Sequence, residues 1–265
     1  MLFRSLAGAA LLVGSVVALL LGVGGRAPAV ALPLSLAGTV AFLAWERRAP
    51  DPILPLDLFE RGLIAVAAVA SALMGAVMMT SLTWLPLYAQ GLLGASPTEA
   101  GAVVAPLLLG WPAASVVSAR LTRRVGARPL ARWGLALVGF STLLVRAALD
   151  PRAGATALRA AMFVMGAGLG VCNTALVIAV QESVPWERRG VATASTVFFR
   201  TIGGTVAVGA FGALVASRLA GHVPETVLRD LVGPTHGRGL ASATLVEASR
   251  QLRDAVITEI GRAHV

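Results

Sequence analysis

The chain has 265 residues, of which 57% are hydrophobic and only 13% are charged. About a quarter of the residues in a soluble domain are charged, so this composition excludes an ordinary soluble enzyme. The net charge of +9 comes from arginine alone, and no basic face with interleaved aromatic residues indicates nucleic-acid binding. The single cysteine, Cys172, excludes disulfides, thiolate metal clusters and Cys-pair redox chemistry. The sequence therefore predicts an integral membrane protein surrounded by a lipid bilayer.

The two ends of the chain differ from the rest. Residues 1–5 and 259–265 can be encoded by DNA that resembles a common sequencing-library adapter, read in complementary orientations. We therefore expect residues 1–5 and 259–265 to be sequencing scars and the remainder to be a fragment of a longer protein.

Apolar stretches of about 20 residues, the length that crosses a bilayer, recur along the chain between turn-forming Gly and Pro segments. The sequence predicts an all-α bundle of about seven transmembrane spans. Beyond residue 217 the chain becomes polar, and residues 241–258 have the pattern of an amphipathic helix. The predicted spans are 6–25, 28–45, 62–88, 98–119, 131–149, 156–181 and 190–217.

The distribution of arginine predicts the orientation of the spans. The alternate loops 46–61, 120–132 and 182–189 contain ten arginines, whereas the short loops between them contain three. Because basic loops stay on the cytoplasmic side, these three loops should be cytoplasmic, and residues 218–258 should lie outside.

Enzyme signatures are absent from the sequence. We find neither a zinc-protease nor a P-loop motif, and His222 and His236 lie in the predicted outer loop. The run Gly166-x-Gly168-x-Gly170 lies in an apolar span, where small residues allow close helix packing. We expect no catalytic site, no cofactor and no metal.

Residues 119–128 (A-R-L-T-R-R-V-G-A-R) resemble the cytoplasmic signature G-x-L-x-D-R-x-G-R-[RK] of the major facilitator superfamily, in its C-terminal-half form. Arg123 replaces the family's Asp, so this copy lacks the carboxylate of the usual gate ion pair. The other departures are Ala119 and Ala127, and the matching positions are Leu121, Arg124, Gly126 and Arg128.

A tight glycine turn with flanking arginines can hold carboxylates or helix C-termini at the inner face. The resemblance therefore implies a gating or structural role for Arg124, Gly126 and Arg128. For Arg120 and Arg132, the alternative of simple positive-inside charge carries equal weight.

Further stretches are similar to the fourteen-helix drug:proton antiporter group of this superfamily. The resemblance implies two linker helices over 6–45 and five of the six C-terminal-half helices over 62–217, with an N-terminal half and a final helix missing. The stretches are R-A-P-D-P-I-L-P-L-D-L-F at 48–59, L-P-L-Y-A-Q-G-L-L-G at 85–94, V-P-W-E-R-R-G-V-A at 184–192 and F-F-R-T-I-G-G-T-V-A-V-G at 198–209.

Arg200 is the one charged residue deep within a predicted span. It lies ten residues beyond Gly190, which is about 15 Å along a helix. An intramembrane arginine should face protein or water and find a partner, here in a neighbouring helix or in the missing half. The alternative is that Arg200 extends towards the inner interface as a structural anchor.

A pocket for amphipathic compounds would combine flexible, aromatic and hydrogen-bonding side chains. Two spans contain such residues in apolar surroundings, although each alone also fits a helix–helix contact. No acidic residue lies at the centre of a span, so a proton-coupling carboxylate is expected in the missing half. The predicted cavity-lining residues are Met78, Thr83, Trp84, Gln90, Asn173 and Gln181, with Met79, Thr80 and Thr174 beside them.

Together these features predict a fragment of an inner-membrane transporter that exports small amphipathic compounds. Export in exchange for protons, by alternating access, is implied by the resemblance. Three alternatives remain open: a carrier of nutrients or siderophores, a membrane scaffold without transport, and a membrane enzyme.

Overall fold

The computed structural model describes residues 6–23, 27–48, 56–60, 62–150 and 153–219. Within these ranges the chain is helical and contains no strand, which confirms the predicted fold class. The predicted amphipathic helix at 241–258 and both unusual ends lie outside the described residues. The elements are α1 (Leu6–Val23), α2 (Pro28–Glu46), η1 (Leu56–Leu58), α3 (Gly62–Leu93), α4 (Pro97–Val125), α5 (Ala127–Ala148), α6 (Gly154–Glu182), η2 (Trp186–Arg188) and α7 (Arg189–Leu219).

Six of these helices are long and apolar enough to cross a membrane, and α1 contributes a shorter apolar stretch, Ala7–Gly22. The helices lie at the seven predicted positions, but several extend further than predicted. Helix α3 continues to Leu93, and the predicted loop at 120–132 is helical except at Gly126. Arginine, leucine and alanine are strong helix formers, so α4 and α5 continue beyond their apolar stretches.

Local sequence explains where α4 begins and ends. The Ser96 hydroxyl accepts a hydrogen bond from the backbone N–H of Glu99 (3.3 Å), and the Glu99 carboxylate accepts one from the backbone N–H of Ser96 (2.8 Å). This capping box satisfies two donors that the helix start leaves free, and Pro97 occupies the first turn. At the other end Gly126 has φ 88°, a conformation that favours glycine, and the chain reverses into α5 within this one residue.

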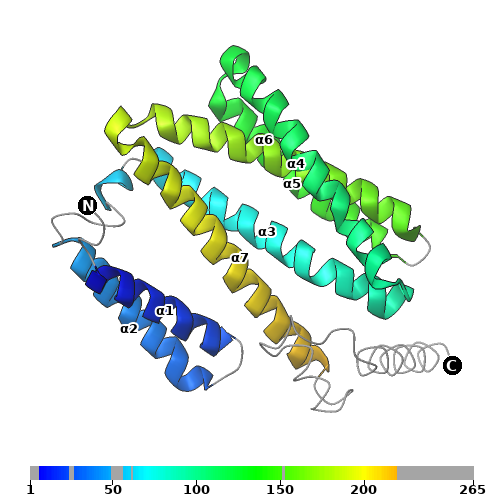
Figure 1. The fold of residues 1–265 in the computed structure, drawn as a ribbon, viewed down its shortest axis with the longest axis horizontal. Coiled ribbons are helices and arrows are strands. Elements are labelled where there is room, and N and C mark those ends of the chain that lie inside the picture. Colours follow the sequence, from blue (N-terminus) through cyan, green and yellow to red (C-terminus); the bar gives the residue numbers. More distant parts are fainter. Residues whose placement is uncertain (1–5, 24–26, 49–55, 61, 151–152, 220–265) are drawn as a thin grey trace.

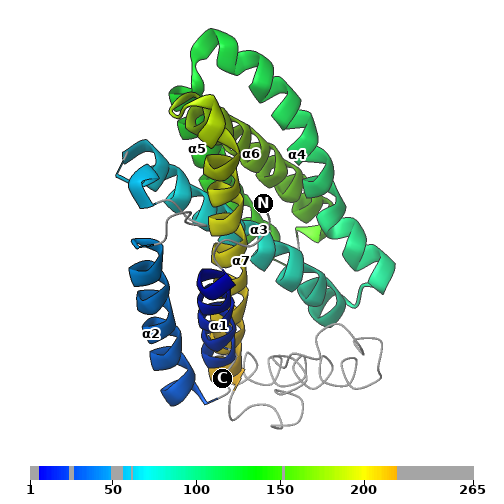
Figure 2. The same ribbon diagram turned by 60° about the vertical axis from the view of Figure 1, so that its left-hand side comes forward.

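The helices form three groups (Figure 1). Helices α1 and α2 pair as a hairpin, α3 runs beside α7, and α4, α5 and α6 form a third group. Viewed from another side, α1 and α2 are separate from α4–α6, and α1 contacts α7 (Figure 2). The core lies around α6, whose fully buried side chains include Leu158, Met162, Met165 and Leu169.

Glycines allow the helices to approach closely within each group. A Cβ at Gly75 of α3 would lie 1.8 Å from the carbonyl oxygen of Arg200 on α7, which is too close for any other residue. A Cβ at Gly166 would lie 2.3 Å from the carbonyl oxygen of Leu107, and one at Gly170 would lie 2.3 Å from that of Trp111. Gly166 and Gly170 therefore serve helix packing, as the sequence predicts.

Candidate functional site

Arg200 lies where the α3–α7 pair meets the α4–α6 group. Its Nη1 donates a hydrogen bond to Oδ1 of Asn173 on α6 (2.6 Å). Its guanidinium carbon also lies 5.6 Å from the ring centroid of Trp111 on α4, within the range of a cation–π contact. All three side chains are half-buried. The arginine thus connects three helices from two groups.

The backbones that carry these side chains are held by the glycine contacts. The carbonyl of Arg200 lies against Gly75, so α7 cannot shift at this level without moving α3. The carbonyl of Trp111 lies against Gly170, three residues before Asn173 on α6. The amide and the indole ring are therefore presented to the guanidinium from two helices that are packed directly together.

The positive charge of Arg200 has two neutral partners in this cluster. Asn173 offers a neutral amide oxygen and Trp111 offers the negative face of a ring, so neither contact carries a formal negative charge. A guanidinium is always protonated in proteins. The cluster can therefore orient a cation within the bundle, but it leaves that charge available to an anionic group or a carboxylate.

The other predicted cavity residues do not gather in one place. The Trp84 ring packs edge-to-face against Phe211, with centroids 5.2 Å apart. Gln90 donates to the carbonyl of Pro86 (3.4 Å), and Gln181 donates to the hydroxyl of Thr193 (3.1 Å). Met78 packs against the core, and Thr83 is half-buried. Of the six, Asn173 is the one that accepts a hydrogen bond from Arg200.

A hollow of about 530 Å³ opens between α3, α5 and α7. None of the six predicted lining residues borders it, although Thr80, which the sequence also indicates, does. Most of its walls are formed by apolar side chains, many of them small, together with a few hydroxyl groups. Such walls suit an uncharged amphipathic group. The lining residues are Ala76, Val77, Thr80, Ser81, Thr142, Ala207, Ala210, Phe211 and Leu214.

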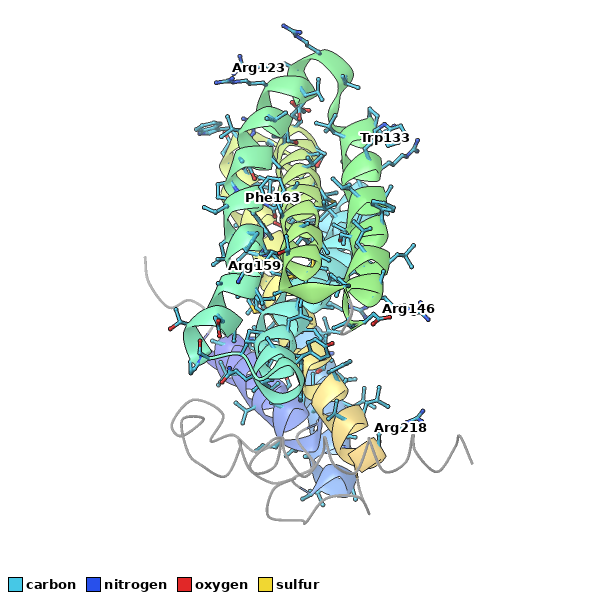
Figure 3. All side chains as sticks on the ribbon, turned by 90° about the vertical axis from the view of Figure 1, so that its right-hand side faces the viewer. Arg123, Trp133, Arg146, Arg159, Phe163 and Arg218 are labelled. Carbon is cyan, nitrogen blue, oxygen red and sulfur yellow. The ribbon has the colours of Figure 1, made fainter. Side chains whose placement is uncertain are left out.

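The glycine turn carries the motif residues Arg124, Gly126 and Arg128. Both arginines are exposed, and within the described ranges neither forms an ion pair. In Figure 3 the neighbouring Arg123 extends from this end of the α4–α5 hairpin, while Arg146 lies towards the other end. The described residues also contain no group of His, Cys, Asp and Glu side chains that could hold a metal.

Two contacts were not apparent from the sequence. Arg188 of η2 forms an ion pair with Asp57 of η1, and Phe199 of α7 packs edge-to-face against Phe59, with centroids 5.6 Å apart. These residues are more than 130 positions apart in the chain, and no local pattern pairs them. For Trp111 the sequence offers one signal, an aromatic residue inside a span, but not its arginine partner.

Comparison with known proteins gives a consistent family. The protein-family model described as Major Facilitator Superfamily matches residues 2–208 of this chain. Multidrug transporter protein MdtP of Bacillus subtilis is 31% identical over 185 residues, which cover 70% of this chain and 34% of the relative. The Tetracycline resistance determinant of Streptomyces rimosus is 32% identical over 192 residues, which cover 71% of this chain and 54% of the relative. The chain thus spans between a third and a little over half of these relatives.

Proposed function

The chain belongs to the major facilitator superfamily, and on that basis we propose that its complete parent exports small amphipathic compounds across a bacterial inner membrane. In this proposal the chain supplies two linker helices, α1 and α2, and five helices of the C-terminal half, α3 to α7. An N-terminal half and a final helix complete the protein. Export proceeds in exchange for protons, by rocking of the two halves about a site near the midplane.

The observation that carries the proposal is the cluster of Arg200, Asn173 and Trp111. A charged side chain at the bilayer centre costs about 2.5–3.5 kcal/mol even on insertion scales, so such residues mark functional or structural sites. Here the guanidinium has one neutral hydrogen-bond acceptor and one aromatic face. The remaining charge suits a group that binds in one state of a transport cycle and leaves in another, such as a carboxylate of the missing half.

The names of the relatives support the proposed class of compound. Two of them carry names of multidrug transport or tetracycline resistance. The hollow between α3, α5 and α7 has mostly apolar walls, which fits the apolar part of such compounds. The motif residues Arg124, Gly126 and Arg128 act, in this proposal, at the cytoplasmic gate between the two halves.

The test uses the complete reading frame, expressed in bacteria that lack their own exporters. We expect efflux of a panel of cationic dyes and tetracycline, and loss of that efflux when a protonophore collapses the proton gradient. Efflux that persists without the gradient contradicts proton coupling. Uptake in place of efflux indicates a nutrient or siderophore carrier, and no movement of any compound indicates a scaffold.

The role of Arg200 has its own test in the same cells. Replacing Arg200 with Leu should abolish efflux at unchanged abundance in the membrane, because the cluster loses its charge. The matched control is Arg218→Leu, which removes the same charge from the exposed last turn of α7 and should leave efflux within about twofold. Normal efflux by the Arg200→Leu variant would rule out the proposed role.

A further inference from the structure

The turn between α4 and α5 carries a strong positive charge with no carboxylate to balance it. Between Glu99 and Asp150 the sequence contains no acidic residue. All five arginines of the turn are exposed, and within the described ranges none forms an ion pair. They are Arg120, Arg123, Arg124, Arg128 and Arg132. Like charges one helical turn apart repel each other, so this arrangement favours an anion from outside the chain.

Three of these arginines border an open hollow of about 700 Å³ along the surface of α4. The same hollow is lined by Val117, Ala119 and Leu121, so it has charged and apolar walls side by side. Arginine matches a phosphate group through two parallel hydrogen bonds. The apolar walls would serve no purpose for a free phosphate ion, but they can contact the glycerol and the first methylenes of a lipid.

The position of the hollow also fits a lipid. It lies at the end of a membrane-spanning helix, where α4 passes from exposed apolar residues such as Val116 and Val117 to its arginines. On the adjacent α5, Trp133 is 72% exposed at the same end of the hairpin (Figure 3). Exposed tryptophan at a helix end is typical of the level of the lipid headgroups.

We propose that this hollow binds the headgroup of phosphatidylglycerol, an anionic phospholipid. Arg120 and Arg123 hold the phosphate, and Val117 and Leu121 contact the start of the acyl chains. The inference requires that α4 and α5 span a membrane, but it does not depend on export or proton coupling. Arg124 also belongs to the proposed gate, so the test changes only Arg120 and Arg123.

The experiment measures lipid retained by the purified 265-residue chain in detergent. The protein is mixed with equal amounts of phosphatidylglycerol and phosphatidylcholine, and the bound lipids are counted by native mass spectrometry. We expect wild type to retain phosphatidylglycerol in preference to phosphatidylcholine. The double variant Arg120→Gln, Arg123→Gln should bind phosphatidylglycerol about tenfold more weakly, since each basic residue near the surface contributes to the attraction.

The matched control is Arg146→Gln, which removes an arginine from the opposite end of α5 and should leave retention unchanged. Equal retention of the two lipids by wild type, or equal losses in the control and the double variant, would overturn the proposal. Displacement of the lipid by inorganic phosphate at the same concentration would also overturn it, since the site would then recognise the free ion.

A second measurement needs no variant and is independent of variant folding. Raising the ionic strength should displace phosphatidylglycerol from wild type, because salt screens the attraction between phosphate and guanidinium. The small amount of bound phosphatidylcholine should stay the same. Retention of phosphatidylglycerol that does not respond to salt would contradict a site based on Arg120 and Arg123.

Discussion

At the scale of single residues, Arg200 shows how a membrane protein can keep a charge inside its bundle. One hydrogen bond to Asn173 and one aromatic face from Trp111 replace part of the hydration that the guanidinium loses. Both contacts come from helices other than its own. The position of the side chain therefore depends on the packing of three helices.

The cation–π contact can be measured directly. Replacing Trp111 with Leu should lower the free energy of unfolding by about 0.5–2 kcal/mol, because the guanidinium loses the ring face in partly desolvated surroundings. Trp111→Phe should retain part of this stabilisation, since it keeps an aromatic ring. The measurement is thermal unfolding of the purified protein in detergent, in a double-mutant cycle with Arg200→Leu. Fully additive effects of the two substitutions would show that ring and guanidinium do not interact.

At the scale of helices, glycine determines which ones can pack together. Gly75 and Gly203 bring α3 and α7 into backbone contact, and Gly166 and Gly170 do the same for α4 and α6. In lipid the hydrophobic effect does not drive helices together, so close packing of this kind supplies much of their association. These four glycines therefore join helices within two of the three groups in Figure 1, the α3–α7 pair and the group of α4, α5 and α6.

A methyl group added at Gly75 should separate α3 from α7. Gly75→Ala places its Cβ within 1.8 Å of a backbone oxygen that no rotamer change can move, so we expect destabilisation of about 1–3 kcal/mol or more. The control is Gly139→Ala on α5, where no atom lies within 4 Å of the added Cβ and alanine should be neutral or slightly stabilising. The two variants are compared by their midpoints of thermal unfolding. Equal midpoints would contradict the role of Gly75 in packing α3 against α7.

Helix positions could be predicted from the sequence because length and hydropathy determine them locally. The extension of α4 to Val125 could not be predicted in this way. The apolar stretch ends where the arginines begin, but the helix continues through them. For the site, the sequence singled out Arg200 and Asn173 separately, but their contact depends on how α6 and α7 pack. The ion pair of Asp57 and Arg188 depends on the same long-range arrangement.

At the scale of the whole molecule, the orientation in the membrane stays a prediction from arginine counts. Single cysteines can test it with a membrane-impermeant maleimide on intact cells. Ser96→Cys, before α4, should react from outside, whereas Arg123→Cys, near the glycine turn, should react only after the cells are opened. Cys172 is fully buried and serves as the unreactive internal reference. The reverse pattern of labelling would invert the topology.

The segment around η1 is attached both to η2 and to the first half of α7. The ion pair of Asp57 and Arg188 is more than half exposed, so it contributes little energy by itself. The buried Leu58 and the ring pair of Phe59 and Phe199 anchor the same segment more firmly. A displacement of this segment would therefore act on the start of α7 as well as on α3. Helices α3 and α7 thus have a common anchor at this end, and Arg200 directly follows the anchoring Phe199 on α7.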